Sequence, residues 1–111
     1  MASVEYSIAI QAPVTKVFKE ATDYDNMQRW QPNLISVNVT AGNPLRAGSI
    51  VSMQRRFQTS DIFVNADVID FQRNKRVEMR GVHGRFRFTR VIEFQPGGGE
   101  TIIRDKIEVK T

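Results

Sequence analysis

The sequence predicts an α+β domain: a seven-stranded antiparallel sheet with two short helices between its first and second strands. Three observations lead to this prediction. Residues 4–11 alternate apolar and polar side chains with the period of a half-buried strand. Residues 13–30 change to the spacing of short amphipathic helices. From residue 34 onward the pattern is again that of strands, separated by polar or glycine-rich turns.

The first strand is expected from Val4 to Gln11, and the helices follow it directly. Pro13 suits the first position of a helix, because its missing N–H needs no partner there. Apolar residues then recur at i, i+3, i+4 and i+7, which places on one helical face Val14, Val17, Phe18 and Ala21. Thr22-Asp23 is expected to cap a second short turn that runs to Trp30.

Six further strands are expected after the helices. Their ranges are Ile35–Thr40, Ser49–Phe57, Ile62–Phe71, Arg76–Val82, Arg85–Gln95 and Glu100–Lys110. The glycines after Pro96 are interpreted as a hairpin turn rather than a phosphate-binding loop, because no helix follows them.

The last hairpin can be given a register from its apolar faces. One face of each strand is apolar: Phe86, Phe88, Ile92 and Phe94 on the first, and Thr101, Ile103, Ile107 and Val109 on the second. Pairing Phe94 with Thr101 brings these two faces together. The same register opposes two charged pairs: Arg90–Asp105 on the apolar face and Arg87–Glu108 on the polar face.

Composition bounds the class of protein. With 111 residues and 41% hydrophobic side chains, the chain is expected to form one domain over residues 1–111. It has no cysteine and a single histidine, His83, so we expect no disulfide, no metal and no cofactor. No apolar run approaches the roughly 20 residues that span a bilayer. The N-terminus lacks the pattern of a signal peptide, so a cytoplasmic location and no membrane insertion are expected.

The positive charge is unevenly distributed. The net charge is +4, and residues 55–111 account for the whole excess. This would suit a nucleic-acid partner. However, the basic residues of the last hairpin share one face with Glu93 and Glu108; they are Arg85, Arg87, Arg104, Lys106 and Lys110. Exposed aromatic residues are not interleaved with them and no recognition helix is apparent, so no nucleic-acid partner is expected.

The order of these motifs resembles the START-like superfamily, also called SRPBCC or the polyketide cyclase/dehydrase and lipid-transport family. The likeness covers nearly the whole chain, and the matching residues are Ala12, Pro13, Val17, Phe18, Asp23, Trp30, Pro32, Gly48, Phe94, Pro96, Gly99 and Thr101. The resemblance implies a helix-grip fold, in which a curved seven-stranded sheet wraps a long C-terminal helix around an apolar cavity. It also implies binding of lipids, sterols, polyketides or aromatic metabolites, which some members cyclise or dehydrate.

The sequence departs from this pattern at its end. It stops at Thr111, where the long C-terminal helix of the family would begin. Two explanations stay open: the domain is truncated at its C-terminus, or something else covers the concave face. An apolar face that is left bare would drive association. We therefore expect a homodimer through the concave face, with an apolar ligand or a C-terminal helix as the alternative occupants.

The predicted function is binding or transport of a hydrophobic or amphipathic small molecule in a cavity on the concave face. Two other classes stay open: a polyketide cyclase/dehydrase-like enzyme that uses Arg90 and Asp105, and a protein-interaction module whose concave face docks another chain. The predicted ligand-binding residues are Trp30, Met53, Phe57, Met79, Phe86, Phe88, Arg90, Ile103 and Asp105.

Three catalytic candidates are Arg90, Asp105 and His83, and each also has a purely structural interpretation. Arg90, oriented by Asp105, could anchor a carboxylate or enolate, or the two could form a structural ion pair. His83 could act as a general base, or it could be an exposed histidine in the turn beside Gly84. Trp30 could gate the cavity, or it could be a core residue where the helices meet the sheet.

Overall fold

The computed structural model describes residues 2–24, 34–42 and 45–110, except for the side chain at position 57. Over these residues the chain forms one helix and seven strands. Their bounds are β1 Ala2–Ile10, α1 Val14–Thr22, β2 Leu34–Thr40, β3 Ile50–Phe57, β4 Ser60–Gln72, β5 Arg76–His83, β6 Phe86–Gly97 and β7 Glu100–Lys110. The predicted second helical turn, which runs to Trp30, lies outside the described residues.

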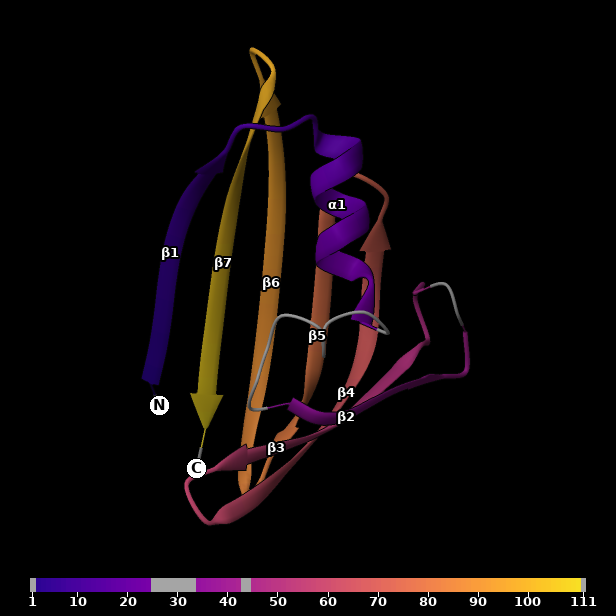
Figure 1. Cartoon of the computed structure of the whole chain (residues 1–111), viewed down its shortest axis with the longest axis vertical. Helices are drawn as coiled ribbons and strands as arrows, with labels where there is room; N and C mark the ends of the chain where they lie inside the picture. The colour runs from indigo at the N-terminus through magenta and orange to yellow at the C-terminus, as the bar shows by residue number, and fades with distance from the viewer. Residues whose placement is uncertain (1, 25–33, 43–44, 111) are drawn as a thin grey trace.

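The strands form a single antiparallel sheet in the order β1-β7-β6-β5-β4-β3-β2. The first and last strands lie side by side, with Ala2 opposite Val109. The sheet is curved, and α1 lies against its concave face (Figure 1). After residue 34, the described part of the chain contains strands and no helix. The predicted α+β class and curved seven-stranded sheet are confirmed.

Helix α1 packs through the apolar face predicted for it. Val17 and Phe18 are buried. The ring of Phe18 meets Phe71 and Phe94 edge-on, with centroid distances of 5.4 and 4.9 Å. Just before the helix, the Ala12 carbonyl accepts a hydrogen bond from the buried Thr101 hydroxyl at 2.9 Å. The helix is therefore tied to β4, β6 and β7 at one end of the concave face.

The register predicted for the last hairpin is wrong by two residues. Phe94 pairs with Ile103 rather than Thr101, and Gly97 pairs with Glu100. The turn is therefore only Gly98-Gly99, with φ values of 58° and 83° that glycine adopts without strain.

Pro96 belongs to β6 rather than to the turn. The pairing of β5 with β6 ends at Glu93, so no β5 residue needs a hydrogen bond from position 96, and a proline is tolerated there. Both predicted charged pairs shift with the register: Asp105 lies opposite Ile92, and Glu108 lies opposite Thr89. The assignment of faces survives, because a slip of two residues keeps every side chain on its side of the sheet.

The backbones of β4 and β5 approach each other closely at Gly81. A Cβ atom at this position would lie 2.0 Å from the Asn65 carbonyl oxygen and 2.6 Å from the Ala66 Cα. Both contacts are with backbone atoms, which cannot turn away as the end of a side chain can. Only glycine fits here, and its absent side chain lets the two strands come together beneath the concave face.

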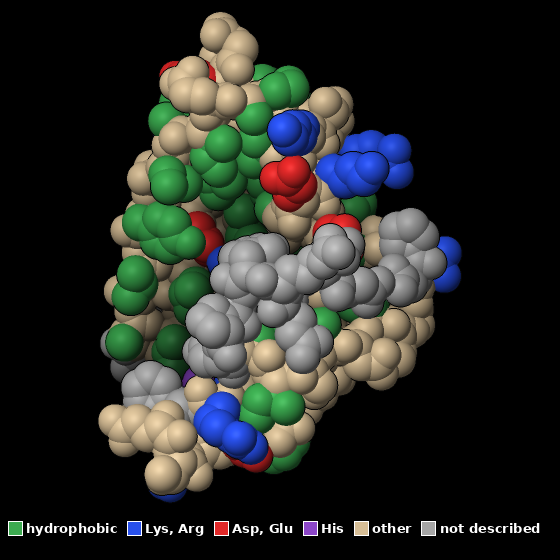
Figure 2. Space-filling model, viewed as in Figure 1, with side chains coloured by type: hydrophobic (Ala, Val, Ile, Leu, Met, Phe, Trp, Pro, Cys, Tyr) green, Lys and Arg blue, Asp and Glu red, His purple; other side chains and the backbone are tan. Residues whose placement is uncertain are grey.

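Part of the concave face is left open by α1. On β1, the inward-facing side chains Val4, Tyr6 and Ile8 are 62%, 49% and 51% exposed. Figure 2 shows hydrophobic side chains gathered on this face over β1 and its neighbours. We call these three residues the β1 strip. The described residues thus enclose a core around α1 and leave an apolar surface beside it.

Candidate functional site

A cavity of about 640 Å³ opens on the concave face. This volume falls within the range of roughly 300–1,000 Å³ that is typical of small-molecule sites. Strands β3 to β7 and one residue that follows α1 supply its lining: Tyr24, Met53, Arg55, Ile62, Val64, Ala66, Met79, His83, Phe86, Phe88, Arg90, Ile107 and Val109. Each strand contributes alternate residues, because only every second side chain points to this face.

Arg90 and Asp105 meet at the β6–β7 side of the cavity. Arg90 Nε donates to Asp105 Oδ1 at 3.0 Å, and Arg90 Nη2 donates to Oδ2 at 2.6 Å. Tyr6 on β1 also donates its hydroxyl hydrogen to Oδ2, at 2.8 Å. Asp105 is 2% exposed, whereas the Arg90 side chain is 33% exposed. Asp105 therefore lies behind Arg90, and only the arginine lines the cavity.

The pKa values of both partners of Asp105 reflect this arrangement. Burial lowers the pKa of Arg90, but the hydrogen bonds and the charge of Asp105 outweigh it and leave the pKa above its usual value. Burial, followed by the hydrogen bond to Asp105, raises the pKa of Tyr6. Arg90 is thus held charged, and Tyr6 is held neutral as a donor.

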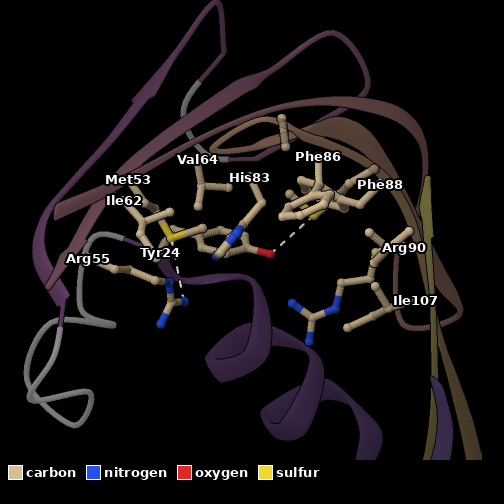
Figure 3. A pocket seen from close by; sticks show the side chains of 13 residues that line it. Tyr24, Met53, Arg55, Ile62, Val64, His83, Phe86, Phe88, Arg90 and Ile107 are labelled. Carbon is tan, nitrogen blue, oxygen red and sulfur yellow. Dashed lines mark hydrogen bonds between the residues drawn. The ribbon is translucent and has the colours of Figure 1, made fainter. Parts of the chain in front are cut away.

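Arg55 is a second cationic group in the cavity, and it projects from β3. Its guanidinium and that of Arg90 lie on either side of Tyr24 and His83 (Figure 3). Its Nη2 lies 3.9 Å from the Met53 sulfur, which is a weak acceptor. Burial, and then the nearby charge of Arg90, lower the pKa of Arg55.

Tyr24 closes the inner side of the cavity, next to the end of α1. It is 4% exposed, and its hydroxyl lies 3.3 Å from the Met79 sulfur. Burial is the main cause that raises the pKa of Tyr24. The hydroxyl is therefore neutral and gives the deep part of the cavity a polar group beside apolar side chains.

His83 is the last residue of β5 and pairs with Phe86 and Val64 across its neighbouring strands. It is exposed and lines the outer part of the cavity. The turn that follows begins at Gly84, whose φ is 63°. Among the described residues, no hydrogen bond joins its imidazole to Arg90 or Asp105, so the three catalytic candidates do not form one hydrogen-bonded group.

Comparison with known proteins identifies the family. The family described as "Polyketide cyclase / dehydrase and lipid transport" matches residues 1–110. The chain belongs to the polyketide cyclase/dehydrase and lipid-transport family. The resemblance expected from the sequence is thereby confirmed. No curated protein sequence matches the chain.

Solved structures show which fold the chain shares with other proteins. The structure titled "Ara h 8.0201" superposes with a TM-score of 0.83 at 14% identity, over 99% of this chain and 77% of that one. A START superfamily protein from Mycobacterium smegmatis gives 0.81 at 16% identity, over 98% and 78%. The Zhui aromatase/cyclase from Streptomyces sp. R1128 gives 0.78 at 9% identity, over 99% and 69%. At these identities the likeness concerns the fold, which is the helix-grip fold.

Five of the predicted ligand-binding residues line the cavity: Met53, Met79, Phe86, Phe88 and Arg90. Asp105 is placed behind Arg90, and Ile103 packs against the core instead of lining the cavity. Trp30 and the side chain of Phe57 lie outside the described residues. The role of each residue in ligand binding remains a prediction.

The sequence analysis missed other residues that line the cavity, namely Tyr24, Arg55, Ile62, Val64, Ala66, Ile107 and Val109. The sequence places Ile107 and Val109 on the apolar face of the last hairpin, so the assignment of faces was enough to predict that they line the cavity. Arg55 lies between the candidates Met53 and Phe57 in the predicted strand Ser49–Phe57, so the period of two could also have included it. Tyr24, in the predicted second helical turn, gave no such signal.

The described residues of this family member include no helix that is long and apolar enough to cross a membrane. Within residues 2–24, 34–42 and 45–110, no cluster of three or more histidine, cysteine, aspartate or glutamate side chains is placed to hold a metal ion. The cytoplasmic location and the absence of a nucleic-acid partner stay predictions.

Proposed function

We propose that the protein binds or carries an apolar or amphipathic small molecule, such as a lipid, a polyketide or an aromatic metabolite, in the cavity on the concave face. The observation that carries this proposal is the open cavity of about 640 Å³, lined by apolar side chains from β3 to β7 with a few polar groups among them. Such a lining can bury most of a small apolar ligand and orient it through the polar groups. The description of the family is consistent with this function.

Binding fits the polar groups better than catalysis does. Both carboxylate oxygens of Asp105 already accept hydrogen bonds, from Arg90 and Tyr6. A general base needs a free acceptor within hydrogen-bond reach of the proton that it removes. Asp105 is buried behind Arg90 and has no such free acceptor facing the cavity.

The proposal is tested by titration with N-phenylnaphthylamine, an uncharged apolar dye whose fluorescence rises in apolar sites. The matched pair of variants is Ile62→Asn, on the cavity side of β4, and Phe63→Asn, on the opposite side of the same strand. We expect Ile62→Asn to weaken dye binding about fivefold, because apolar contact area is lost. Phe63→Asn should leave the affinity unchanged. Equal affinities for all three proteins would contradict binding in this cavity.

Native mass spectrometry of protein purified from cells gives an independent test. A small molecule that remains bound, and that is lost from Ile62→Asn under the same conditions, would support the proposal. Protein that is ligand-free, and that also fails to bind the dye, would contradict it.

A second candidate function is a cyclase/dehydrase reaction, favoured by one observation: His83 and Arg90 line the same cavity. In this reaction His83 would remove a proton from an activated methylene group, and Arg90 would stabilise the resulting enolate. The test is incubation of a poly-β-ketone thioester with the protein and with His83→Ala. A cyclised or dehydrated product that forms only with the unmodified protein would support the enzyme. Equal product from both would exclude this role of His83.

For the open part of the concave face, we propose a second copy of the chain as the occupant. The β1 strip supports this, because Val4, Tyr6 and Ile8 present an apolar row at the edge of the sheet. Two identical apolar surfaces can cover each other around a two-fold axis. An apolar ligand or a C-terminal segment would leave the protein monomeric in solution.

A further inference from the structure

The described lining of the cavity carries more positive than negative charge. Its charged residues are two arginines, Arg55 and Arg90, and none of the described aspartates or glutamates lines it. The one carboxylate in contact with either arginine, within the described residues, is that of Asp105 behind Arg90. Among the described side chains, two guanidinium groups against one carboxylate leave an excess of one positive charge at this place.

Among the described residues, Arg55 holds the positive charge that no carboxylate neutralises. No carboxylate of the described residues forms an ion pair with it. Its contact with the Met53 sulfur at 3.9 Å uses one of the five N–H donors of a guanidinium. Arg55 lines a cavity whose described walls are mainly apolar. A partly buried cation of this kind needs an anionic partner or water.

Arg90 adds a second donor on the other side of the same opening. Its Nε and Nη2 atoms donate to Asp105, whereas Nη1 makes no hydrogen bond to the described residues. Figure 3 shows Arg55 and Arg90 projecting into the cavity on either side of Tyr24 and His83. Asp105 therefore fixes the position of Arg90 and leaves one of its nitrogens available to a ligand.

The electrostatics of Arg55 agree with this geometry. Burial and the charge of Arg90 both lower the pKa of Arg55, so they disfavour its charged form. An anion placed beside Arg55 would remove this penalty. An uncharged ligand would cover the guanidinium and increase the penalty, because it would displace water without replacing its hydrogen bonds.

We propose that the ligand of this cavity is an amphipathic anion whose carboxylate or phosphate group is bound by Arg55, with Arg90 as a second donor. This inference rests on the proposed function and narrows its ligand class. The apolar part of the ligand lies against the aromatic and aliphatic side chains between the two arginines, such as Phe86 and Phe88. Arg55 supplies the binding charge, and the Arg90–Asp105 pair supplies a fixed donor.

The test is displacement of the uncharged dye N-phenylnaphthylamine by three competitors with the same saturated chain: dodecanoate, dodecyl phosphate and dodecanol. We expect at least one anion to displace the dye at concentrations about tenfold lower than dodecanol does, which is the gain typical of a hydrogen bond to a charged group. The better of the two anions identifies the head group as carboxylate or phosphate.

The matched variants are Arg55→Met and Arg56→Met. Arg56 is the next residue of β3 and points away from the cavity, where its side chain is 62% exposed. We expect Arg55→Met to remove the advantage of the anion over dodecanol, with both competitors measured against the dye affinity of the same variant, whereas Arg56→Met keeps this advantage. Added salt should also reduce the advantage in the unmodified protein, which tests the charge without any substitution.

The other outcomes separate the inference from the proposed function. If dodecanol displaces the dye as well as both anions do, or if the advantage survives in Arg55→Met, the inference is overturned and the binding function stands. If the dye does not bind the unmodified protein at all, the binding function is overturned, and the inference falls with it.

Discussion

Arg90 and Asp105 form a two-point ion pair although they are not opposite each other in the sheet. Asp105 lies opposite Ile92, and Arg90 lies opposite Ile107, so the pair runs diagonally between β6 and β7. A diagonal contact suits arginine, because its long side chain reaches along the strand to the next residue of the same face. The same reach brings the guanidinium to the cavity while the carboxylate stays buried.

Removal of this carboxylate should destabilise the protein. We expect Asp105→Ala to lower the free energy of unfolding by about 2–4 kcal/mol, because it leaves a partly buried guanidinium and the Tyr6 hydroxyl without their hydrogen-bond acceptor. The control is Asp61→Ala, which breaks the exposed pair with Arg56 and should lower the free energy of unfolding much less. Urea unfolding of both variants measures the difference. Equal costs would mean that the diagonal pair behaves as an ordinary surface pair.

Alanine at Gly81 should be poorly tolerated. Its Cβ would lie 2.0 Å from the Asn65 carbonyl oxygen, so the backbones of β4 and β5 would have to separate. We expect Gly81→Ala to cost about 1–3 kcal/mol of unfolding free energy, as overpacking does. Gly97→Ala is the control, because nothing lies within 4 Å of its Cβ position. Thermal unfolding of the two variants decides the matter, and a similar midpoint for both would contradict the close approach of the strands.

The two tyrosines of the chain, Tyr6 and Tyr24, should ionise later than free tyrosine. Burial is the main cause that raises the pKa of each above 10.0, and the hydrogen bond to Asp105 adds to it for Tyr6. Because the folded-state pKa is the higher one, this contribution to stability is complete below pH 10.0 and is lost as the pH rises above it.

Ultraviolet titration of phenolate measures this effect. Two midpoints above that of the unfolded chain in denaturant are expected for the native protein. Tyr6→Phe should remove one of them and leave the midpoint of Tyr24. A native titration curve that overlays the unfolded one would contradict the burial of Tyr24 and the contact of Tyr6.

The β1 strip predicts concentration-dependent association. A charge placed in it, as in Ile8→Lys, should shift a dimer toward monomer, because the charge would be buried in an apolar contact. The control Ser7→Lys carries the same new charge on the opposite side of the strand. Sedimentation velocity over a range of concentrations measures the distribution. If the unmodified protein stays monomeric at high concentration, the proposed dimer is contradicted.

Much of the fold could be predicted from local patterns. The strands, the helix over Val14–Thr22 and the side of the sheet on which Phe88, Arg90 and Asp105 lie all agree with the sequence analysis. These features depend on periods of two and 3.6 residues, which neighbouring residues express by themselves. The candidate residues Met53, Met79 and Phe86 could be placed in the cavity for the same reason.

The register of the last hairpin could not be predicted from the pattern of faces. Shifts of two residues leave every apolar side chain on the same face, so the pattern permits several registers. The turn conformation decides between them, because Gly98 and Gly99 both adopt positive φ and place Gly97 opposite Glu100. The three consecutive glycines of the sequence do not reveal which two form the turn.

By itself, the sequence determined the class of the fold, the order of its elements, the polarity of each strand face and the family to which the chain belongs. Only the tertiary structure decided which residues share the cavity. The curvature of the sheet brings Arg55 of β3 toward Arg90 of β6, although two strands lie between them. Curvature and close approach arise from contacts between distant segments, such as the one at Gly81, and local periodicity carries no record of them.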